Sequence, residues 1–289
     1  MRTHFRSLPG NGRTPLMTTT LRPAEPLRHN ADGTRSRRFQ VCVNGRPVGG
    51  LRLSTHPEYG PGVARIEDLR IEEPDRRRGR GTVAALACEE VVRGWGCKRI
   101  EASVPGDAEA ALRLATALGY VVRSRNMAKR VDVTPPLPSG NVARPLTEVE
   151  YGPWLAQDRD RFVRSLTGRG VPETEAYAKA DGSYARFLPD GLATTDTLIS
   201  VLEQEGNPVG TLWLSLRPQT AFVVDVEVHA EQRGRGHGRT LMLLAEAQAA
   251  EAGKDRIALH VFAGNIPAER LYASLGYETT QYHLHKTLT

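Results

Sequence analysis

The stretch AFVVDVEVHAEQRGRGHG at residues 221–238 joins a run of β-branched residues to a glycine-rich loop. Valines alternate with acidic residues in the first part, which predicts a strand. A helical spacing of apolar residues follows up to Gly253, where a glycine is expected to end the helix. Residues 257–262 read as a further strand, and residues 265–276 as a short helix. The expected order is therefore strand, loop, helix, strand, helix.

The loop places three glycines next to Arg233, Arg235 and His237. Glycines let successive backbone N–H groups point into one concavity, and the helix that begins there adds its positive end. Such a loop suits a pyrophosphate, and its arginines, with Arg239, add contacts to phosphate oxygens. A tight turn with solvated arginines is the alternative. The pattern has neither the Gly-Lys-Ser/Thr of a P-loop nor the spacing of a dinucleotide fold.

Two motifs further along extend this pattern, namely Asn265 and the run Leu271-Tyr272-x-x-Leu275-Gly276-Tyr277. Together with Arg233-x-x-Gly236-x-Gly238, they resemble the acetyl-CoA site of the GNAT superfamily of N-acetyltransferases. The resemblance covers residues 141–289, and a weaker copy covers residues 18–133. It implies that acetyl-CoA is the co-substrate. The residues implied to hold it are Val226 and Val228 through their backbone N–H groups, Arg233, Gly234, Arg235, Gly236, His237, Gly238 and Arg239 in the loop, and the side chain of Asn265.

The resemblance also implies that Tyr272 is the general acid that protonates the departing CoA thiolate. Acetyl transfer to an amine further needs a group that takes the ammonium proton. Many relatives carry a glutamate where this chain has Val224. Three other residues are therefore candidates for the base: Asp225, Glu227 and His260. The two carboxylates face away from Val224 unless a bulge re-aims them. An imidazole with an ordinary pKa of about 6.5 suits a base at neutral pH. A structural or substrate-contacting role is the alternative for each candidate.

The first half of the chain repeats the same order of elements. A hairpin signal at Asn44-Gly45, a glycine-rich loop at residues 77–82 and a short helix closed by Gly119 follow one another as their counterparts do in the second half. An internal repeat is therefore expected.

The two copies differ at positions that carry chemistry. We expect Val83 at the position of the loop's last glycine and Asp107 at the position of Asn265. Ala115 stands where the second copy has Tyr272, so the phenol is missing. The first copy is therefore interpreted as degenerate and without catalysis.

The expected fold class is α/β, more strictly α+β. It consists of two tandem GNAT folds, each a mixed, mostly antiparallel twisted sheet flanked by helices. The expected division is a disordered N-terminal extension at residues 1–17, a degenerate GNAT domain at 18–133, a Pro-rich linker at 134–140 and a catalytic GNAT domain at 141–289. Met1 and Met17 both stand as candidates for the natural start.

Two helices at residues 148–166 and 172–187 are expected in the second copy. Its aromatic residues Tyr177, Tyr184 and Phe187 are interpreted as core residues, because aromatic residues at helical spacing usually face a core. A wall of the acceptor site is the alternative.

The composition is that of a soluble globular protein, with 39% hydrophobic and 25% charged residues. No apolar run approaches the roughly 18 residues of a membrane span, and the N-terminus lacks the apolar core of a signal peptide. Three cysteines, Cys42, Cys88 and Cys97, do not pair in number or spacing. Free thiols in a reducing cytoplasm are therefore expected, without membrane contact and without a metal.

The net charge of +6 is unevenly distributed. Residues 1–140 hold 24 Lys and Arg against 14 Asp and Glu, whereas residues 141–289 hold 15 against 19. An acidic second half suits a cationic acceptor, and a bias in nucleotide composition is the alternative explanation. Nucleic-acid binding is not expected, because no binding motif or aromatic interleaving is present.

These observations favour an acetyl-CoA-dependent N-acetyltransferase that moves an acetyl group to a primary amine by direct attack on the thioester. The expected partner is the amine of a small molecule or of a peptide or protein, and a homodimer is left open. The alternative is a regulatory tandem GNAT module that senses acyl-CoA or binds a protein without turnover.

Overall fold

The computed structural model describes residues 18–57, 59–131 and 136–288. The expected extension at 1–17, with both candidate starts, and the first residues of the expected linker lie outside these ranges. The chain forms two compact units. The first unit comprises Met1–Ala102 with Lys286–Thr289, and the second comprises Ser103–His285. The domain boundaries expected at residues 133 and 141 follow the sequence repeat. The two units instead meet between residues 102 and 103 and between residues 285 and 286, in each case within a strand.

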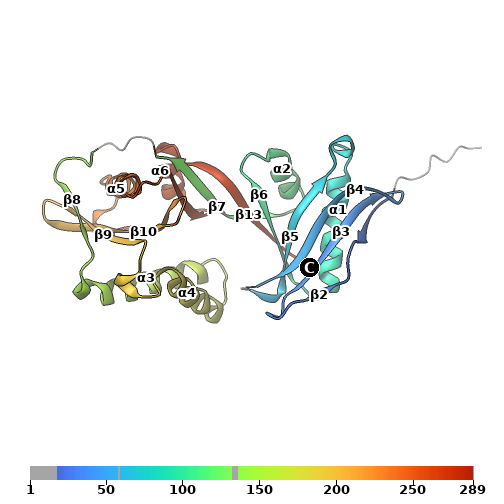
Figure 1. Cartoon of the computed structure of the whole chain (residues 1–289), viewed down its shortest axis with the longest axis horizontal. Coiled ribbons are helices and arrows are strands. Elements are labelled where there is room, and N and C mark those ends of the chain that lie inside the picture. Colours follow the sequence, from blue (N-terminus) through green and yellow to red (C-terminus); the bar gives the residue numbers. More distant parts are fainter. Residues whose placement is uncertain (1–17, 58, 132–135, 289) are drawn as a thin grey trace, which may run out of the picture. The chain divides into compact units, whose positions relative to one another are not determined.

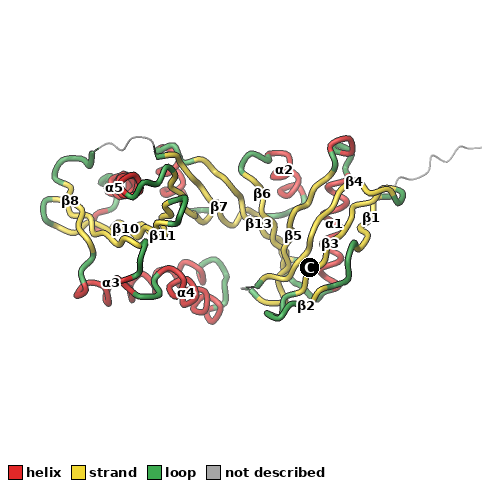
Figure 2. The backbone as a smooth tube through the Cα atoms, viewed as in Figure 1, coloured by secondary structure: helices red, strands yellow, loops and turns green. Residues whose placement is uncertain are grey.

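The first unit has a five-stranded sheet in the order β1-β3-β4-β5-β6, with the short β2 paired to β3 (Figures 1 and 2). All neighbours are antiparallel except β5 and β6. Its elements are β1 (Thr19–Pro23), β2 (Arg28–His29), β3 (Arg35–Val43), β4 (Arg46–His56), β5 (Gly60–Ile71), the 3-10 helix η1 (Glu73–Asp75), α1 (Arg80–Gly94) and β6 (Arg99–Pro105). Asn44 and Gly45 join β3 to β4 with φ of 48° and 83°, so the predicted hairpin turn is confirmed.

The second unit has a seven-stranded sheet in the order β8-β9-β10-β11-β12-β7-β13, in which only β11 and β12 are parallel. Its elements are α2 (Glu109–Ala117), β7 (Val121–Arg130), β8 (Asn141–Pro145), α3 (Glu148–Thr167), α4 (Glu173–Phe187), η2 (Gly191–Ala193), β9 (Thr197–Gln204), β10 (Asn207–Leu216), β11 (Ala221–Val228), η3 (Ala230–Gln232), α5 (His237–Glu251), β12 (Arg256–Phe262), α6 (Ile266–Ser274) and β13 (Glu278–Thr287). The prediction of mixed, mostly antiparallel sheets flanked by helices is confirmed.

Helices cover both faces of the second sheet, with α5 on one face and α3 and α4 on the other (Figure 1). The alternation of side chains along β10 shows this division. Leu212 and Leu214 are buried in the core beneath α5, while Trp213 between them packs against Trp154 of α3 on the opposite face. Tyr184 of α4 stacks on Trp213 at 5.6 Å between ring centroids, as expected for a core residue.

The start of α3 is fixed locally. Thr147 caps the helix through its side chain, which accepts a hydrogen bond from the backbone N–H of Glu150. The Glu150 carboxylate in turn accepts a hydrogen bond from the backbone N–H of Thr147. The predicted helices at 148–166 and 172–187 match α3 and α4 to within a residue.

The structure corrects the register between the two copies. Gly79 and Gly236 both cap a helix in the left-handed conformation, which aligns Gly81, not Val83, with Gly238. The caps of the short helices α2 and α6 are Ala108 and Asn265, so Asp107 is not the counterpart of Asn265. The first copy therefore keeps the counterparts of Gly236 and Gly238, has Arg77 in place of Gly234, and lacks the asparagine.

All three cysteines are buried free thiols, as predicted. Within the described ranges, no helix is long and apolar enough to cross a membrane.

Candidate functional site

The parallel strands β11 and β12 pair only where they begin, from Ala221 opposite Ile257 to Val223 opposite Leu259. Strand β11 continues to Val228 and stays paired with β10 over that length. Its edge toward β12 is therefore without a strand partner after Val223. An unpaired strand edge offers backbone donors and acceptors to an extended ligand. The backbones of Val226 and Val228, both predicted to hold the cofactor, belong to this segment of β11.

A β-bulge lies at Val224, because Trp213 of β10 pairs with Asp225 and the next residue, Leu214, pairs with Val223. The extra residue shifts the alternation of the strand. Val224 packs with the cluster beneath α3 and α4, whereas Val226 packs with the core beneath α5. The bulge thus turns Asp225 toward α3. A bulge that re-aims this carboxylate was the condition for treating Asp225 as a candidate base.

The glycine-rich loop runs into the first turn of α5. Gly234 and Gly236 have φ of 78° and 89°, a conformation that favours glycine. Backbone N–H groups of residues 234–238 donate no hydrogen bond to any other described residue. Free amides at a helix start form an anion-binding concavity, so the loop has the geometry that a pyrophosphate requires.

Two arginine side chains of the loop form hydrogen bonds with other residues of the protein. Arg233 donates to the carbonyl of Val228 at 3.2 Å, and Arg239 donates to the hydroxyl of Ser274 at 2.7 Å. Packing against α6 also favours glycine at position 238, because a Cβ there would lie 3.3 Å from the Leu271 side chain. This glycine lets α5 pack closely on α6.

Two predicted residues lie on or beside α6. Asn265 caps the helix, its side chain accepting from the Ala268 backbone at 3.5 Å. Tyr272 is buried in the core beneath α5, with 7% of its surface exposed. Burial, with a smaller contribution from the negative charge of Asp225, raises the pKa of Tyr272 to about 12. The phenol therefore keeps its proton at neutral pH and lies within electrostatic reach of Asp225.

Arg161 of α3 joins three carboxylates into one network, and sequence analysis did not find it. Its guanidinium bonds Asp225 at 2.6 Å and also pairs with Asp158 and Glu227. The hydroxyl of Tyr184 on α4 donates to Asp158. Asp158 is 4% exposed, so this network is built into the protein and is not a surface ion pair. The spacing of Asp158 and Arg161 on a helix was the available signal, but it fits a solvated surface pair equally well.

Asp225 lies at the accessible end of this network. Its side chain is 31% exposed, so it is reachable although protein atoms surround it. Burial and the neighbouring negative charge of Asp158 raise the pKa of Asp225 to about 7, and Arg161 opposes the shift. Among the candidate bases, Asp225 thus combines access with a proton affinity suited to neutral pH.

His260 lies on β12, and its Nδ1 is 2.9 Å from the side-chain oxygen of Asn126 on β7. Desolvation by the surrounding protein, together with His283, Arg123 and Lys179, lowers the pKa of His260. The side chain is nevertheless exposed to solvent, which screens part of this effect. The imidazole is therefore neutral at pH 7 and a weaker base than its ordinary pKa suggests.

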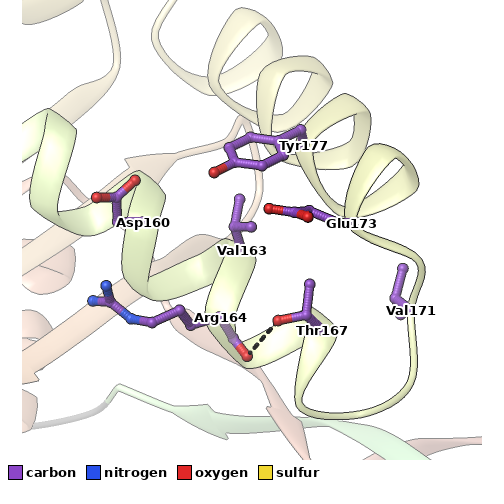
Figure 3. A pocket seen from close by; sticks show the side chains of 7 residues that line it. All are labelled: Asp160, Val163, Arg164, Thr167, Val171, Glu173 and Tyr177. Atoms are coloured by element: carbon purple, nitrogen blue, oxygen red, sulfur yellow. Dashed lines mark hydrogen bonds between the residues drawn. The ribbon is translucent and has the colours of Figure 1, made fainter.

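A cavity of about 480 Å³ lies between α3 and α4 (Figure 3). Tyr177 and Glu173 of α4 face Val163 and Thr167 of α3 across it. Its full lining is Asp160, Val163, Arg164, Thr167, Val171, Glu173 and Tyr177. None of the predicted cofactor-binding or catalytic residues lines this cavity, so it is separate from the parted strands.

The first unit lacks the phenol, as the sequence indicates. By the corrected register, Ala115 on α2 occupies the position of Tyr272. Its loop differs as well, because Arg80 is buried and paired with Asp75 where the second unit has His237.

The fold and the loop define the class of protein, and comparison with known proteins agrees. A model of the acetyltransferase (GNAT) family matches residues 12–120 and 156–277. The chain belongs to this family and contains two copies of its domain.

Relatives of known sequence match either one copy or both. An uncharacterized N-acetyltransferase of Bacillus subtilis, YdgE, is 30% identical over 149 residues, which are 50% of this chain and 95% of the relative. A mycothiol acetyltransferase of Thermomonospora curvata is 28% identical over 254 residues, 84% of this chain and 79% of the relative. Among solved structures, a GCN5-related N-acetyltransferase from Sphaerobacter thermophilus has a TM-score of 0.55 at 20% identity, covering 87% of this chain and 80% of that one. This last likeness concerns the fold.

Proposed function

We propose that the second unit transfers an acetyl group from acetyl-CoA to a primary amine. The observation that carries the proposal is the pairing of a buried, protonated phenol with a reachable carboxylate beside strands that part. Tyr272 and Asp225 supply these two groups. Acyl transfer to an amine requires a general acid that is protonated and a general base that is deprotonated at the working pH.

The residues present fit acetyl-CoA. The free amides of residues 234–238 suit its pyrophosphate, and the unpaired edge of β11 near Val226 and Val228 suits its extended arm. When bound, acetyl-CoA supplies the acyl thioester.

Each side chain then has a role. Asp225, or one of the other two candidates, Glu227 and His260, takes the ammonium proton from the acceptor. Tyr272 donates its phenol proton to the departing thiolate. Asn265 retains its free amide nitrogen for the cofactor's arm while its oxygen caps α6.

The acceptor is proposed to be a cationic amine, because three carboxylates face a single guanidinium in the network around Arg161. A net negative surface attracts an ammonium group. Likeness to proteins named mycothiol acetyltransferase makes the deacetylated form of mycothiol one member of the acceptor set to test.

The test is release of free thiol from acetyl-CoA in the presence of amines, polyamines, aminoglycosides and peptides, with the product identified by mass spectrometry. Amine-dependent thiol release is the expected result. Tight CoA binding without release for any acceptor would support the alternative, a sensing module without turnover.

A further inference from the structure

The network around Arg161 contains a buried acid for which the proposed reaction has no direct use. Asp158 is 4% exposed, whereas the side chain of Asp225 is 31% exposed. A buried carboxylate is costly unless it is paired and hydrogen-bonded. Two partners satisfy it: the guanidinium of Arg161 and the hydroxyl of Tyr184.

Arg161 links the two carboxylates, because its guanidinium pairs with Asp158 and bonds Asp225 at 2.6 Å. The nearby negative charge of Asp158 favours the protonated form of Asp225, and the cation of Arg161 opposes this effect. Groups facing Asp225 come from every element around it: Asp158 and Arg161 on α3, Tyr184 on α4, Glu227 on β11 and Tyr272 on α6.

We propose that Asp158 is a positioning residue for acetyl transfer, which holds Asp225, through the Arg161 guanidinium that both carboxylates contact, as the group that accepts the ammonium proton of the acceptor. The inference rests on the proposed function and goes beyond it, because it assigns the base and supplies a residue of α3 to the reaction. Helix α3 thereby contributes to the chemistry as well as covering the sheet.

The protons balance in this scheme. Asp225 takes one proton from the ammonium group, which leaves a neutral amine. The nitrogen forms a bond to the acyl carbon, and the carbon–sulfur bond breaks. Tyr272 gives its proton to the sulfur, and the phenolate takes the second nitrogen proton. One proton in total is released, from Asp225 to solvent.

The first experiment measures the pH dependence of kcat/KM in the full-length chain. In the wild type, activity should rise through an apparent pKa of about 7. Asp158→Asn removes a like charge, so the acidic limb should move to lower pH by roughly one unit or more. Its maximal rate should fall by about tenfold, because a weaker base accepts the proton less readily, while the KM for acetyl-CoA changes less than about twofold.

Two further variants separate this role from a structural one. Asp158→Glu keeps the acid and should keep the limb near its wild-type position. Arg161→Gln removes a cation, so the limb should move to higher pH, opposite to Asp158→Asn. Asp160→Asn is the matched control on the exposed side of α3 and should leave the profile unchanged. A folded Asp158→Asn protein with the wild-type limb would overturn the proposal.

A second readout does not need turnover. Carbon-13 NMR of labelled aspartate carboxyls should show one group that titrates near neutral pH, vanishes in Asp225→Asn and shifts in Asp158→Asn. If no acceptor yields turnover, the proposed function fails while this titration still decides the pairing. A spectrum in which no aspartate titrates near neutral pH would contradict the inference even in an active enzyme.

Discussion

In the proposed reaction, acetyl transfer depends most directly on Tyr272. With a pKa near 12, its phenol stays protonated across the usual assay range, so it donates at every pH at which the base is competent. Tyr272→Phe should lower the acetyl-transfer rate by about 10²–10⁴-fold and leave CoA affinity nearly unchanged. Tyr277→Phe, which alters a buried tyrosine with its ring centre 6.0 Å away, is the control. Single-turnover kinetics measure both, and equal losses in the two variants would exclude a specific acid role.

The choice of base is a second question at the level of single residues. Asp225→Asn should abolish the acidic limb of the pH–rate profile, whereas His260→Ala should retain it, because the pKa of His260 already lies below neutral pH. Glu227→Gln should keep the limb as well, since Asp158 and Arg161 are the charged neighbours that shift the pKa of Asp225. If only His260→Ala lost the acidic limb, His260 on β12 would be the base instead of Asp225.

The pKa of Asp225 also affects folding. A carboxyl whose folded pKa is raised binds more protons in the folded state than in the unfolded one, so stability falls as pH rises from about 4 to about 7. Asp225→Asn should therefore raise the melting temperature relative to wild type more at pH 8 than at pH 4. Differential scanning calorimetry at the two pH values checks this, and an equal change at both would contradict a raised pKa.

The loop and the first turn of α5 form the element that we propose binds the cofactor. Gly236 caps α5 at φ +89° with no other atom near its missing Cβ. Gly236→Val strains this conformation and moves the free amides, so CoA affinity should fall more than about tenfold. Gly253→Val is a matched control, because Gly253 follows the other end of the helix at φ +70° with equally open surroundings. Calorimetric titration with CoA compares them, and equal affinities in the two variants would remove the loop from the binding site.

Elements whose cause is local could be predicted from sequence. The Asn44-Gly45 turn, the loop glycines and the ends of α3 and α4 follow from residues that are neighbours in the chain. The bulge at Val224 depends on how β11 pairs with β10, and no residue in the strand marks it. The network of Asp158 and Arg161 with β11 joins residues far apart in sequence, so it became visible only when α3 was placed against the sheet.

On the scale of the whole chain, β7, the final strand of the first repeat, lies in the second unit, whereas Lys286 near the end of β13 belongs to the first unit. Strand β7 belongs to the first repeat but lies between β12 and β13 in the second unit, where Lys129 donates to the buried Glu246 of α5 at 2.8 Å. At the same offset along the chain, Lys286 of β13 donates to the buried Glu89 of α1 in the first unit at 2.7 Å. The sequence repeat indicates two copies of the domain. It does not indicate that Lys129 pairs with Glu246 and Lys286 with Glu89.

This placement of β7 predicts how the chain tolerates truncation. A fragment of residues 141–289 lacks β7, which leaves Glu246 unpaired and β12 and β13 without their common neighbour. It should be unfolded or insoluble, while a fragment of residues 103–289 should fold and keep thiol release. Circular dichroism and the thiol assay on both fragments test this, and a folded, active 141–289 fragment would show that β7 is dispensable.

The most direct test of the account follows an isotopically labelled acetyl group from acetyl-CoA to the acceptor in the full-length chain. We expect the label to move to the nitrogen of a cationic amine, and Tyr272→Phe to slow this transfer while CoA still binds. Label that stays on CoA with every amine, although CoA binds the second unit tightly, would contradict it.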